Sequence, residues 1–331
     1  MKAVHFGAGS IGRGFIGDLL HDSEYEIVFV DVNMELINQI NRTNSYNLYL
    51  INDNYKKKII DNARAVSSIE NEKEVIEEIK TADIITTSVW ADNLSKIAPI
   101  LSKGLMMREK EGREKINVLA CENAMFNSKM LKTEILKSDN GFTEKGLDKV
   151  ACFPNTSVDR MVLQSIRDGE QTIDIGKDFE LVIEKNKLAN PQSKPIKGAI
   201  YTDNLQKFLE RKLYVINGGH AWAGYMGNIY GYKIIQDVFN NKPFVEEIRK
   251  TMLESSSLLS KKYGFSMEEL RGYIDFAISR FQTPGIKDTI ERVCRSPIRK
   301  LGSKERLVGP CVQCEDYGID NSHLLKGIAS P

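Results

Sequence analysis

The chain has 331 residues, with 46 lysines and arginines against 45 aspartates and glutamates, so its formal net charge is +1. This length exceeds the roughly 150 residues of a typical domain, which favours two domains. The charge balance offers no basic surplus for a nucleic acid and no acidic surplus for a solvating tail. Hydrophobic residues at 41% and charged residues at 27% are typical of a globular protein and exclude disordered and collagen-like chains.

The N-terminal segment meets a glycine at position 7, so its apolar stretch is too short for a signal peptide and reads as a buried strand. No run of about 18 apolar residues is present, so we expect no membrane span and no membrane partner. The cysteines are an odd, scattered set: Cys121, Cys152, Cys294, Cys311 and Cys314. Without a secretory signal, we expect reduced thiols and a cytoplasmic location.

Strands and helices alternate in the first part of the chain. Strands are predicted at residues 2–6, 25–30, 82–90 and 116–121, where β-branched and apolar residues cluster. Helices are predicted between them, at residues 11–20, 34–43 and 72–80. This alternation favours an α/β domain with a parallel sheet that helices cover on both faces.

The pattern changes near residue 195. Beyond the PQSKP stretch at residues 191–195, helical patterns dominate, at residues 204–215, 244–262 and 267–281. We therefore predict one domain at residues 1–195 and a second, mostly α-helical domain at residues 196–331.

A glycine-rich loop, Gly7-Ala8-Gly9-Ser10-Ile11-Gly12, follows the first predicted strand and opens a helix. In a G-x-G-x-x-G loop the first glycine permits a tight turn, the second lets a pyrophosphate approach the backbone, and the third lets the helix pack on the sheet. Free N–H groups at the start of the helix then receive the phosphates. The loop predicts a dinucleotide site.

Asp31 ends the second predicted strand, 19 residues beyond Gly12. A carboxylate there accepts hydrogen bonds from an adenosine ribose and repels a 2′-phosphate, so NAD is favoured over NADP. The alternative is a structural glycine turn with an incidental acidic residue. Because strand, loop, helix, strand and carboxylate occur in register, we favour dinucleotide binding.

Oxidation of an alcohol requires a base for the hydroxyl proton and donors that steady the developing alkoxide. Of the four histidines, His5 lies in the first strand and is expected in the core, and His21 and His323 have no constellation near them. His220 follows Asn217 by three residues, so a helix places both on one face.

Lys212 precedes His220 by eight residues, which is about 80° away around a regular helix, within reach of a flexible side chain. A lysine in a partly buried pocket can have its pKa lowered enough to act as a base. Gly218 and Gly219 are expected to leave the helix surface open to a ligand. The alternative is an ordinary amphipathic helix whose histidine caps a buried polar group.

The segment HFGAGSIGRGFIG at residues 5–17 closely resembles the opening of mannitol-1-phosphate 5-dehydrogenases, in the polyol-specific long-chain dehydrogenase/reductase family. Further similar segments follow in order: ADIITTSV (82–89), ACEN (120–123), SVDRMV (157–162), ERKLYVINGGHA (210–221) and ERVCRSPIRKL (291–301). The resemblance therefore extends over nearly the whole chain.

This resemblance implies an N-terminal Rossmann domain with a doubly wound sheet, a helical substrate domain, and metal-independent, NAD-dependent hydride transfer between mannitol 1-phosphate and fructose 6-phosphate. It implies that Lys212 is the general base and that Asn217 and His220 hold and polarise the reacting oxygen. The small-molecule substrate would lie in a cleft lined by Asn123 on the cofactor side and by the Asp159–Arg160 pair. Nothing in the sequence indicates the oligomeric state.

A phosphorylated substrate also needs cations. Arg292, Arg295, Arg299 and Lys300 form a basic cluster near the C-terminus, and a guanidinium suits bidentate phosphate binding. We expect Arg292 and Arg295 to contribute to the substrate site. The alternative is a solvated basic surface.

Several positions depart from the family pattern. The family usually continues some tens of residues further, so the packing or activity of the substrate domain is expected to be affected. Gly218 stands where close relatives tend to have Thr, and Leu181 where they tend to have Trp. Trp90 stands where they usually have Gly near the nicotinamide, so its side chain could crowd the cofactor or pack away from it. These changes leave open a related reaction on an unphosphorylated polyol or hexuronate, or an NAD-binding protein of weakened activity.

Cys311 and Cys314 form a C-x-x-C pair that could be half of a zinc site or a redox pair. No second pair accompanies it and no βαβ unit frames it, so we expect two inert thiols.

Overall fold

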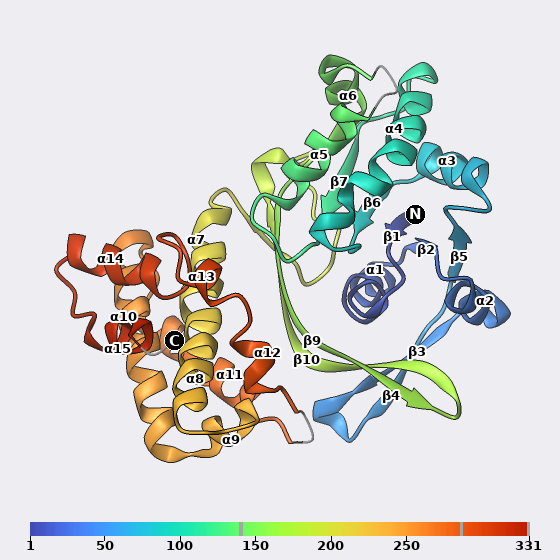
Figure 1. Cartoon of the computed structure of the whole chain (residues 1–331). Helices are drawn as coiled ribbons and strands as arrows, with labels where there is room; N and C mark the ends of the chain where they lie inside the picture. Colours follow the sequence, from blue (N-terminus) through green and yellow to red (C-terminus); the bar gives the residue numbers. More distant parts are fainter. Residues whose placement is uncertain (139–141, 285–286, 330–331) are drawn as a thin grey trace. The chain divides into compact units, whose positions relative to one another are not determined.

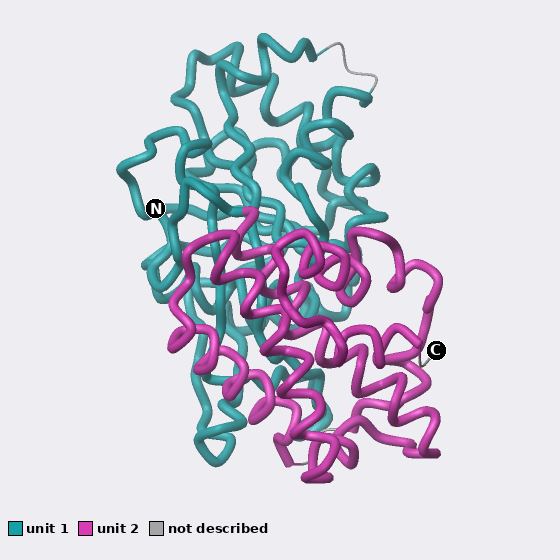
Figure 2. The backbone as a smooth tube through the Cα atoms, turned by 90° about the vertical axis from the view of Figure 1, so that its left-hand side faces the viewer, with its two compact units in different colours: residues 1–205 teal, residues 206–331 magenta. Residues whose placement is uncertain are grey.

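The computed structural model describes residues 1–138, 142–284 and 287–329. The chain divides into two units, residues 1–205 and residues 206–331 (Figure 2). Each unit is built around its own buried apolar side chains.

The first unit contains a six-stranded sheet in the order β5-β2-β1-β6-β7-β8, in which every pair is parallel. Its strands are β1 (Lys2–Phe6), β2 (Glu26–Asp31), β5 (Ala63–Ser67), β6 (Ile84–Thr87), β7 (Ile116–Ala120) and β8 (Ala151–Cys152). The chain runs outward from β1 through β2 to β5, then returns to β6 on the other side of β1. The predicted doubly wound sheet is confirmed, and its strand order reverses at β1.

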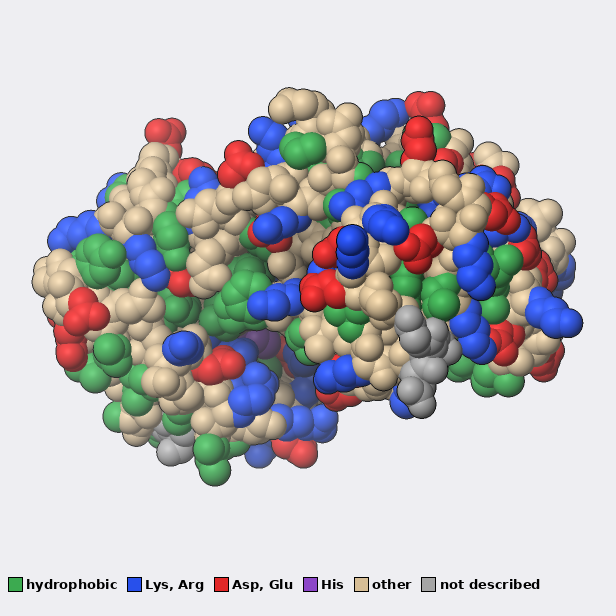
Figure 3. All heavy atoms as spheres, turned by 90° about the horizontal axis from the view of Figure 1, so that it is seen from above, with side chains coloured by type: hydrophobic (Ala, Val, Ile, Leu, Met, Phe, Trp, Pro, Cys, Tyr) green, Lys and Arg blue, Asp and Glu red, His purple; other side chains and the backbone are tan. Residues whose placement is uncertain are grey.

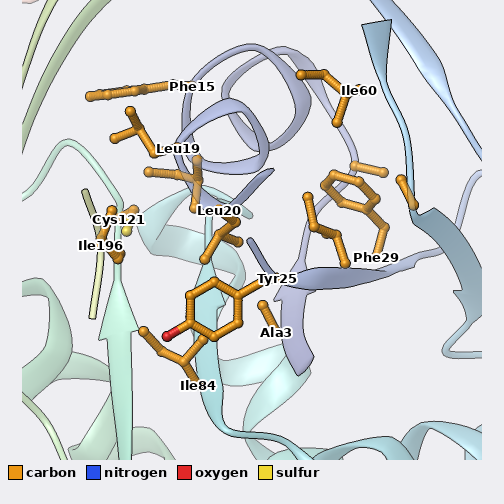
Figure 4. Close-up of a cluster of buried hydrophobic side chains, with 14 of the residues drawn as sticks. Ala3, Phe15, Leu19, Leu20, Tyr25, Phe29, Ile60, Ile84, Cys121 and Ile196 are labelled. Atoms are coloured by element: carbon orange, nitrogen blue, oxygen red, sulfur yellow. The ribbon is translucent and has the colours of Figure 1, made fainter. Parts of the chain in front are cut away.

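Helices cover this sheet (Figure 1). They are α2 (Met34–Thr43), α3 (Glu72–Thr81), α4 (Leu94–Lys110), α5 (Asn127–Lys137) and α6 (Glu144–Val150). Alternate strand residues enter two different apolar clusters, because successive side chains in a strand point to opposite faces. Ala3 and Phe29 belong to one cluster, shown in Figure 4, while Val4 and Val28 belong to the other.

A second sheet in the first unit was not anticipated from the sequence. The long strand β10 (Glu170–Glu184) pairs in antiparallel fashion with β9 (Thr156–Arg167), and the sheet continues in the order β11-β10-β3-β4. Its other strands are β3 (Tyr46–Leu50), β4 (Lys56–Ile60) and β11 (Ile200–Thr202). Short 3₁₀ turns lie at Ile51–Asp53, Ala91–Asn93 and Lys185–Lys187.

The helix after the glycine loop packs closely on both sheets. It consists of a π-helical segment, η1 (Gly12–Gly17), followed by α1 (Asp18–Asp22). A Cβ added at Gly17 would lie 2.9 Å from the Phe29 ring of the first sheet, and one at Gly14 would lie 2.5 Å from Ile173 of β10. These glycines let the helix approach two strand layers more closely than any larger residue would allow.

The second unit is helical, as predicted. A continuous helix runs through α7 (Leu205–Arg211), the π-helical segment η5 (Lys212–Ile216) and α8 (Asn217–Ile229). The remaining helices are α9 (Ile235–Asn240), α10 (Lys242–Tyr263), α11 (Met267–Phe281), α12 (Ile290–Val293), α13 (Pro297–Lys300), α14 (Val308–Asp316) and α15 (Ser322–Ile328). None of the helices in the described ranges is long and apolar enough to cross a membrane. Positive and negative side chains are interspersed over the face shown in Figure 3.

Candidate active site

The glycine loop lies at the carboxyl end of β1, where the strand order reverses. Gly7 has φ +99°, and a Cβ built on it would lie 2.7 Å from the carbonyl oxygen of Ser88. A Cβ on Gly12 would lie 1.8 Å from the carbonyl oxygen of Gly7. Around Gly9, in contrast, no atom of the described residues lies within 4 Å of a built Cβ, apart from those of Gly9 and its chain neighbours. Gly7 and Gly12 are therefore needed by the fold, whereas Gly9 leaves open space in which a phosphate could approach the backbone.

Some backbone N–H groups of the loop donate hydrogen bonds within the protein, and others are left for a ligand. The N–H of Gly7 donates to Val30 O at 2.8 Å, and the N–H of Ala8 donates to Asp31 Oδ2 at 2.6 Å. The helix begins at Ser10, so the N–H groups of its first turn remain as the donors for an anion. The residues that fit a pyrophosphate are thus Gly9, Ser10, Ile11 and Gly12.

Asp31 ends β2, where the sequence predicted a ribose ligand. Its Oδ1 accepts the N–H groups of Val32 and Asn33 at 2.7 and 2.9 Å, and its Oδ2 accepts that of Ala8. A carboxylate has about four acceptor positions, so three backbone donors orient the group and leave one position for a ribose hydroxyl. The arrangement therefore fits an adenosine ribose, and its role as a ligand stays a prediction.

The carboxyl ends of β6 and β7 adjoin this loop and hold a buried acid that the sequence analysis missed. Glu122 is 4% exposed and accepts hydrogen bonds from Thr87 Oγ1 at 2.8 Å and from the N–H of Val89 at 3.0 Å. Burial raises the pKa of this carboxyl group, although those hydrogen bonds oppose the shift. Asn123, the predicted cofactor contact, follows it and is exposed. The sequence feature that could have identified Glu122 is its place as an acidic residue directly after an apolar strand.

Asp159 and Arg160 lie on β9, where Asp159 pairs with Glu180 of β10. The Arg160 side chain is 3% exposed, and its Nη1 lies 2.5 Å from Asp18 Oδ2 and 3.1 Å from Gly14 O. Its guanidinium also lies 5.4 Å from the ring centre of Phe179. These contacts join the glycine-loop helix to the second sheet. A substrate-binding role for Arg160 is still a prediction, and the contacts favour a structural one.

The π-helical segment changes the geometry expected for Lys212. The N–H of Asn217 donates to Lys212 O, five residues back, so one extra residue is accommodated between them. The rotation around the helix axis from Lys212 to His220 is therefore that of seven residues in a regular α-helix, and not eight. The two side chains lie about 20° apart around the axis instead of about 80°. Lys212, Asn217 and His220 thus follow one stripe of the helix.

This stripe is the less buried side of the helix. Lys212 is partly exposed, and from residue 214 to residue 227 every residue is buried except Asn217 and His220. The expectation that Gly218 and Gly219 leave the surface open was wrong. A Cβ on Gly218 would lie 2.8 Å from Arg306 O, and one on Gly219 would lie 2.1 Å from Met252 Cε, so both glycines permit close packing inside the unit.

His220 is held between an aromatic ring and a carboxylate. Its ring stacks on Phe281 with centroids 4.6 Å apart, and its Nε2 lies 3.3 Å from Asp288 Oδ2 without a well-aligned hydrogen bond. Burial lowers the pKa of His220, although the Asp288 carboxylate opposes the shift. The imidazole is therefore neutral near pH 7.

The residues of the basic cluster differ in their exposure and in their ion-pair and hydrogen-bond partners. The Arg292 guanidinium pairs in bidentate fashion with Asp288, four residues back on the chain. Among the described residues, Arg295 has no ion-pair partner, and its side chain is exposed. Lys300 is half-buried and donates to Val293 O at 2.5 Å. Burial lowers the pKa of Lys300, as do the nearby arginines, of which Arg306 contributes most.

Cys311 and Cys314 lie on α14 and are both buried. Burial raises the pKa of the Cys311 thiol, and it raises that of Cys314 to about 12. Protonated, buried thiols are poor nucleophiles, so the structure supports the interpretation of these two residues as inert.

These features define a protein with a dinucleotide-binding type of domain and a helical domain that carries a lysine, an amide and an imidazole on one stripe. The sequence matches the mannitol dehydrogenase Rossmann domain over residues 1–196 and the mannitol dehydrogenase C-terminal domain over residues 204–331. The chain belongs to the mannitol dehydrogenase family.

Two relatives named mannitol-1-phosphate 5-dehydrogenase show the extent of the similarity. The protein from Thermoanaerobacter pseudethanolicus is 42% identical, with 100% of this chain and 85% of the relative covered. That from Geobacillus stearothermophilus is 39% identical, with 100% and 86% covered.

Solved structures share the fold at low identity. A D-sorbitol dehydrogenase in substrate-free form superposes with a TM-score of 0.86 at 16% identity, covering 100% of this chain and 79% of the other. The Pseudomonas fluorescens mannitol 2-dehydrogenase ternary complex with NAD and D-mannitol gives a TM-score of 0.78 at 17% identity, covering 100% and 78%.

Proposed function

We propose that this protein catalyses the NAD-dependent, reversible interconversion of mannitol 1-phosphate and fructose 6-phosphate, with Lys212 as the general base and acid. The observation that carries the proposal is the stripe of Lys212, Asn217 and His220. Lys212 is partly exposed, and Asn217 and His220 are the two partly exposed positions among the buried residues 214–227. The curated relatives at 39–42% identity over the whole chain support the choice of substrate. We expect the protein to act on this free small molecule in the cytoplasm.

The cofactor half of the site is assigned to the first unit. Gly9, Ser10, Ile11 and Gly12 would hold the pyrophosphate, Asp31 would accept a hydrogen bond from the adenosine ribose, and Asn123 would contact the bound dinucleotide. When bound, NAD supplies the acceptor for the hydride that leaves the alcohol carbon.

Proton transfer is assigned to the second unit. In oxidation, neutral Lys212 takes the hydroxyl proton while Asn217 and His220 form hydrogen bonds to the same oxygen. Because burial keeps His220 neutral, it polarises the oxygen without adding a second positive charge beside Lys212. In the reverse direction, the Lys212 ammonium returns the proton.

The phosphate of the substrate is assigned to the basic cluster, with Arg292 and Arg295 as the predicted ligands. The Arg292–Asp288 pair leaves Arg292 with less net positive charge to offer. We therefore expect a larger contribution from Arg295, which has no ion-pair partner among the described residues and is exposed, and from Lys300. Asp159 and Arg160 are the remaining predicted substrate contacts, although the ion pair of the buried Arg160 with Asp18 favours a structural role for this arginine.

The Lys212→Met variant tests the role of the base. Loss of a general base lowers kcat for fructose 6-phosphate reduction by about 10²- to 10⁴-fold. The dissociation constant for NADH should stay within about twofold, because the dinucleotide ligands lie in the first unit. Lys250→Met, on an exposed face of α10, is the matched control and should keep wild-type kcat. Wild-type turnover by Lys212→Met would contradict the assignment.

A further inference from the structure

Trp90 adopts a backbone conformation that suits glycine and not a bulky residue. Its φ is 70° and its ψ is 142°, in a region that residues with a large side chain rarely enter. The side chain is 80% exposed, so burial of its large apolar surface does not offset the strain. A strained aromatic residue exposed to solvent is more typical of a ligand contact than of a core position.

The backbone on both sides of Trp90 is held in place. The N–H of Val89 donates to the buried Glu122 carboxylate at 3.0 Å, and Asn93 Nδ2 donates to Val89 O at 2.7 Å. The N–H of Asn93 donates to Trp90 O at 2.9 Å. These bonds hold the backbone of Trp90, so the point at which its indole is attached is fixed.

That place is beside the glycine loop. The N–H of Ser88 donates to Phe6 O at 2.8 Å, and Ser88 Oγ lies 2.9 Å from His5 Nε2. Trp90 follows Ser88 by two residues, a span of about 7 Å at most between their Cα atoms. The indole is therefore attached just beyond the carboxyl end of β6, in a segment that adjoins the glycine loop, where Val89 Cγ1 lies 3.2 Å from a Cβ built on Gly7.

The strand order indicates which half of a dinucleotide would lie there. Asp31 ends β2 on one side of β1, and Trp90 follows β6 on the other side. A dinucleotide whose adenosine ribose binds Asp31 and whose pyrophosphate crosses the end of β1 extends its second nucleoside over the end of β6.

We propose that the Trp90 indole contacts the nicotinamide half of the bound dinucleotide by ring stacking and so contributes to cofactor affinity. This inference rests on the proposed NAD-dependent function. An exposed aromatic ring is a general platform for heteroaromatic rings.

The test is a binding titration of Trp90→Gly with NADH and with ADP, which lacks the nicotinamide half. We expect about tenfold weaker NADH binding, the size of one stacking contact, and unchanged ADP binding. Glycine adopts the φ of position 90 without strain, so the variant should unfold at or above the wild-type temperature. Tyr55→Gly is the matched control, because Tyr55 also has positive φ (56°) and is 46% exposed, and it should leave both affinities unchanged.

Fluorescence gives a readout that a purely structural role would not move. The chain has two tryptophans, and Trp222 is fully buried in the second unit. Ring stacking should quench the emission of Trp90 when NADH binds, and the Trp90→Phe variant, in which only Trp222 emits, gives the part of the quenching that Trp222 contributes.

Two outcomes would overturn the inference. NADH binding by Trp90→Gly that is as tight as wild type, or tighter, would overturn it while leaving the proposed function in place. A wild-type chain that binds no NADH would contradict both. Weaker NADH binding by Trp90→Gly in a protein that does not turn over fructose 6-phosphate would support the inference and contradict only the proposed function.

Discussion

His5 connects the first strand to the neighbouring strand through two hydroxyl groups. Its Nδ1 lies 2.7 Å from Thr86 Oγ1 and its Nε2 lies 2.9 Å from Ser88 Oγ. The ring is fully buried, and burial lowers the pKa of His5 to about 3, although a hydrogen bond from the imidazole to the Gly7 backbone opposes the shift. The expectation from sequence that His5 is a core residue agrees with this burial.

The pKa of His5 predicts how stability depends on pH. Below its ordinary pKa of about 6.5, the unfolded chain binds a proton at His5 that the folded chain does not bind. The free energy of unfolding should therefore decrease as the pH falls from 6.5 towards 3. The measurement is the urea midpoint at pH 7 and at pH 5, and His5→Gln should show a smaller difference between them. An equal difference in both proteins would contradict the assignment.

Some residue roles could be read from the sequence and others could not. Gly7, Gly12 and Asp31 belong to a local motif whose spacing is fixed by the chain itself, so their positions could be predicted. The Arg292–Asp288 pair and the burial of Arg160 against Asp18 depend on how the elements pack. A list of charged residues does not contain that information, so both arginines looked equally able to bind substrate.

At the scale of elements, the glycine loop contains glycines that the fold requires and one, Gly9, to which we assign a binding role. In the part of the chain that the structure describes, nothing beyond Gly9 and its chain neighbours lies within 4 Å of a Cβ built on Gly9. Gly9→Ala should therefore fold with a melting temperature close to wild type. Its methyl group would occupy the space that a pyrophosphate needs, so NADH binding should weaken by at least about tenfold.

Gly272→Ala is the control for this prediction. Gly272 lies inside α11, and nothing lies within 4 Å of a built Cβ there. Alanine is favoured over glycine in a helix by about 1 kcal/mol, so this variant should be more stable and bind NADH normally. Normal NADH binding by Gly9→Ala would remove the main evidence for the pyrophosphate position.

Most helices and the parallel strands could be predicted because their apolar residues repeat locally. The second sheet could not, since β3 pairs with β10 more than 120 residues later and β4 is mostly lysine and exposed. The π-helical segment at Lys212 also lacked a propensity signal. The sequence feature that corresponds to it is the five-residue spacing of Lys212 and Asn217. In a regular α-helix this spacing would put the two residues on different faces, and they share a face only because the π-helical segment accommodates one extra residue.

At the scale of the whole molecule, the two units carry residues with different proposed roles. The first unit carries the proposed dinucleotide ligands, and the second carries the proposed base and the basic cluster. Both units match domains of one family, and the chain spans 85–86% of the length of the relatives described above. The division of the chain into an α/β part and a helical part could be predicted from the change in pattern near residue 195.

The central claim is that the protein acts on a phosphorylated substrate, and one assay tests it most directly. NADH consumption should be measured with fructose 6-phosphate, fructose and fructuronate side by side at equal concentrations. Because Arg295 and Lys300 are assigned to a phosphate, we predict that kcat/KM for fructose 6-phosphate exceeds that for fructose by at least about 10²-fold. Equal turnover of fructose and fructose 6-phosphate, or preference for fructuronate, would contradict the account.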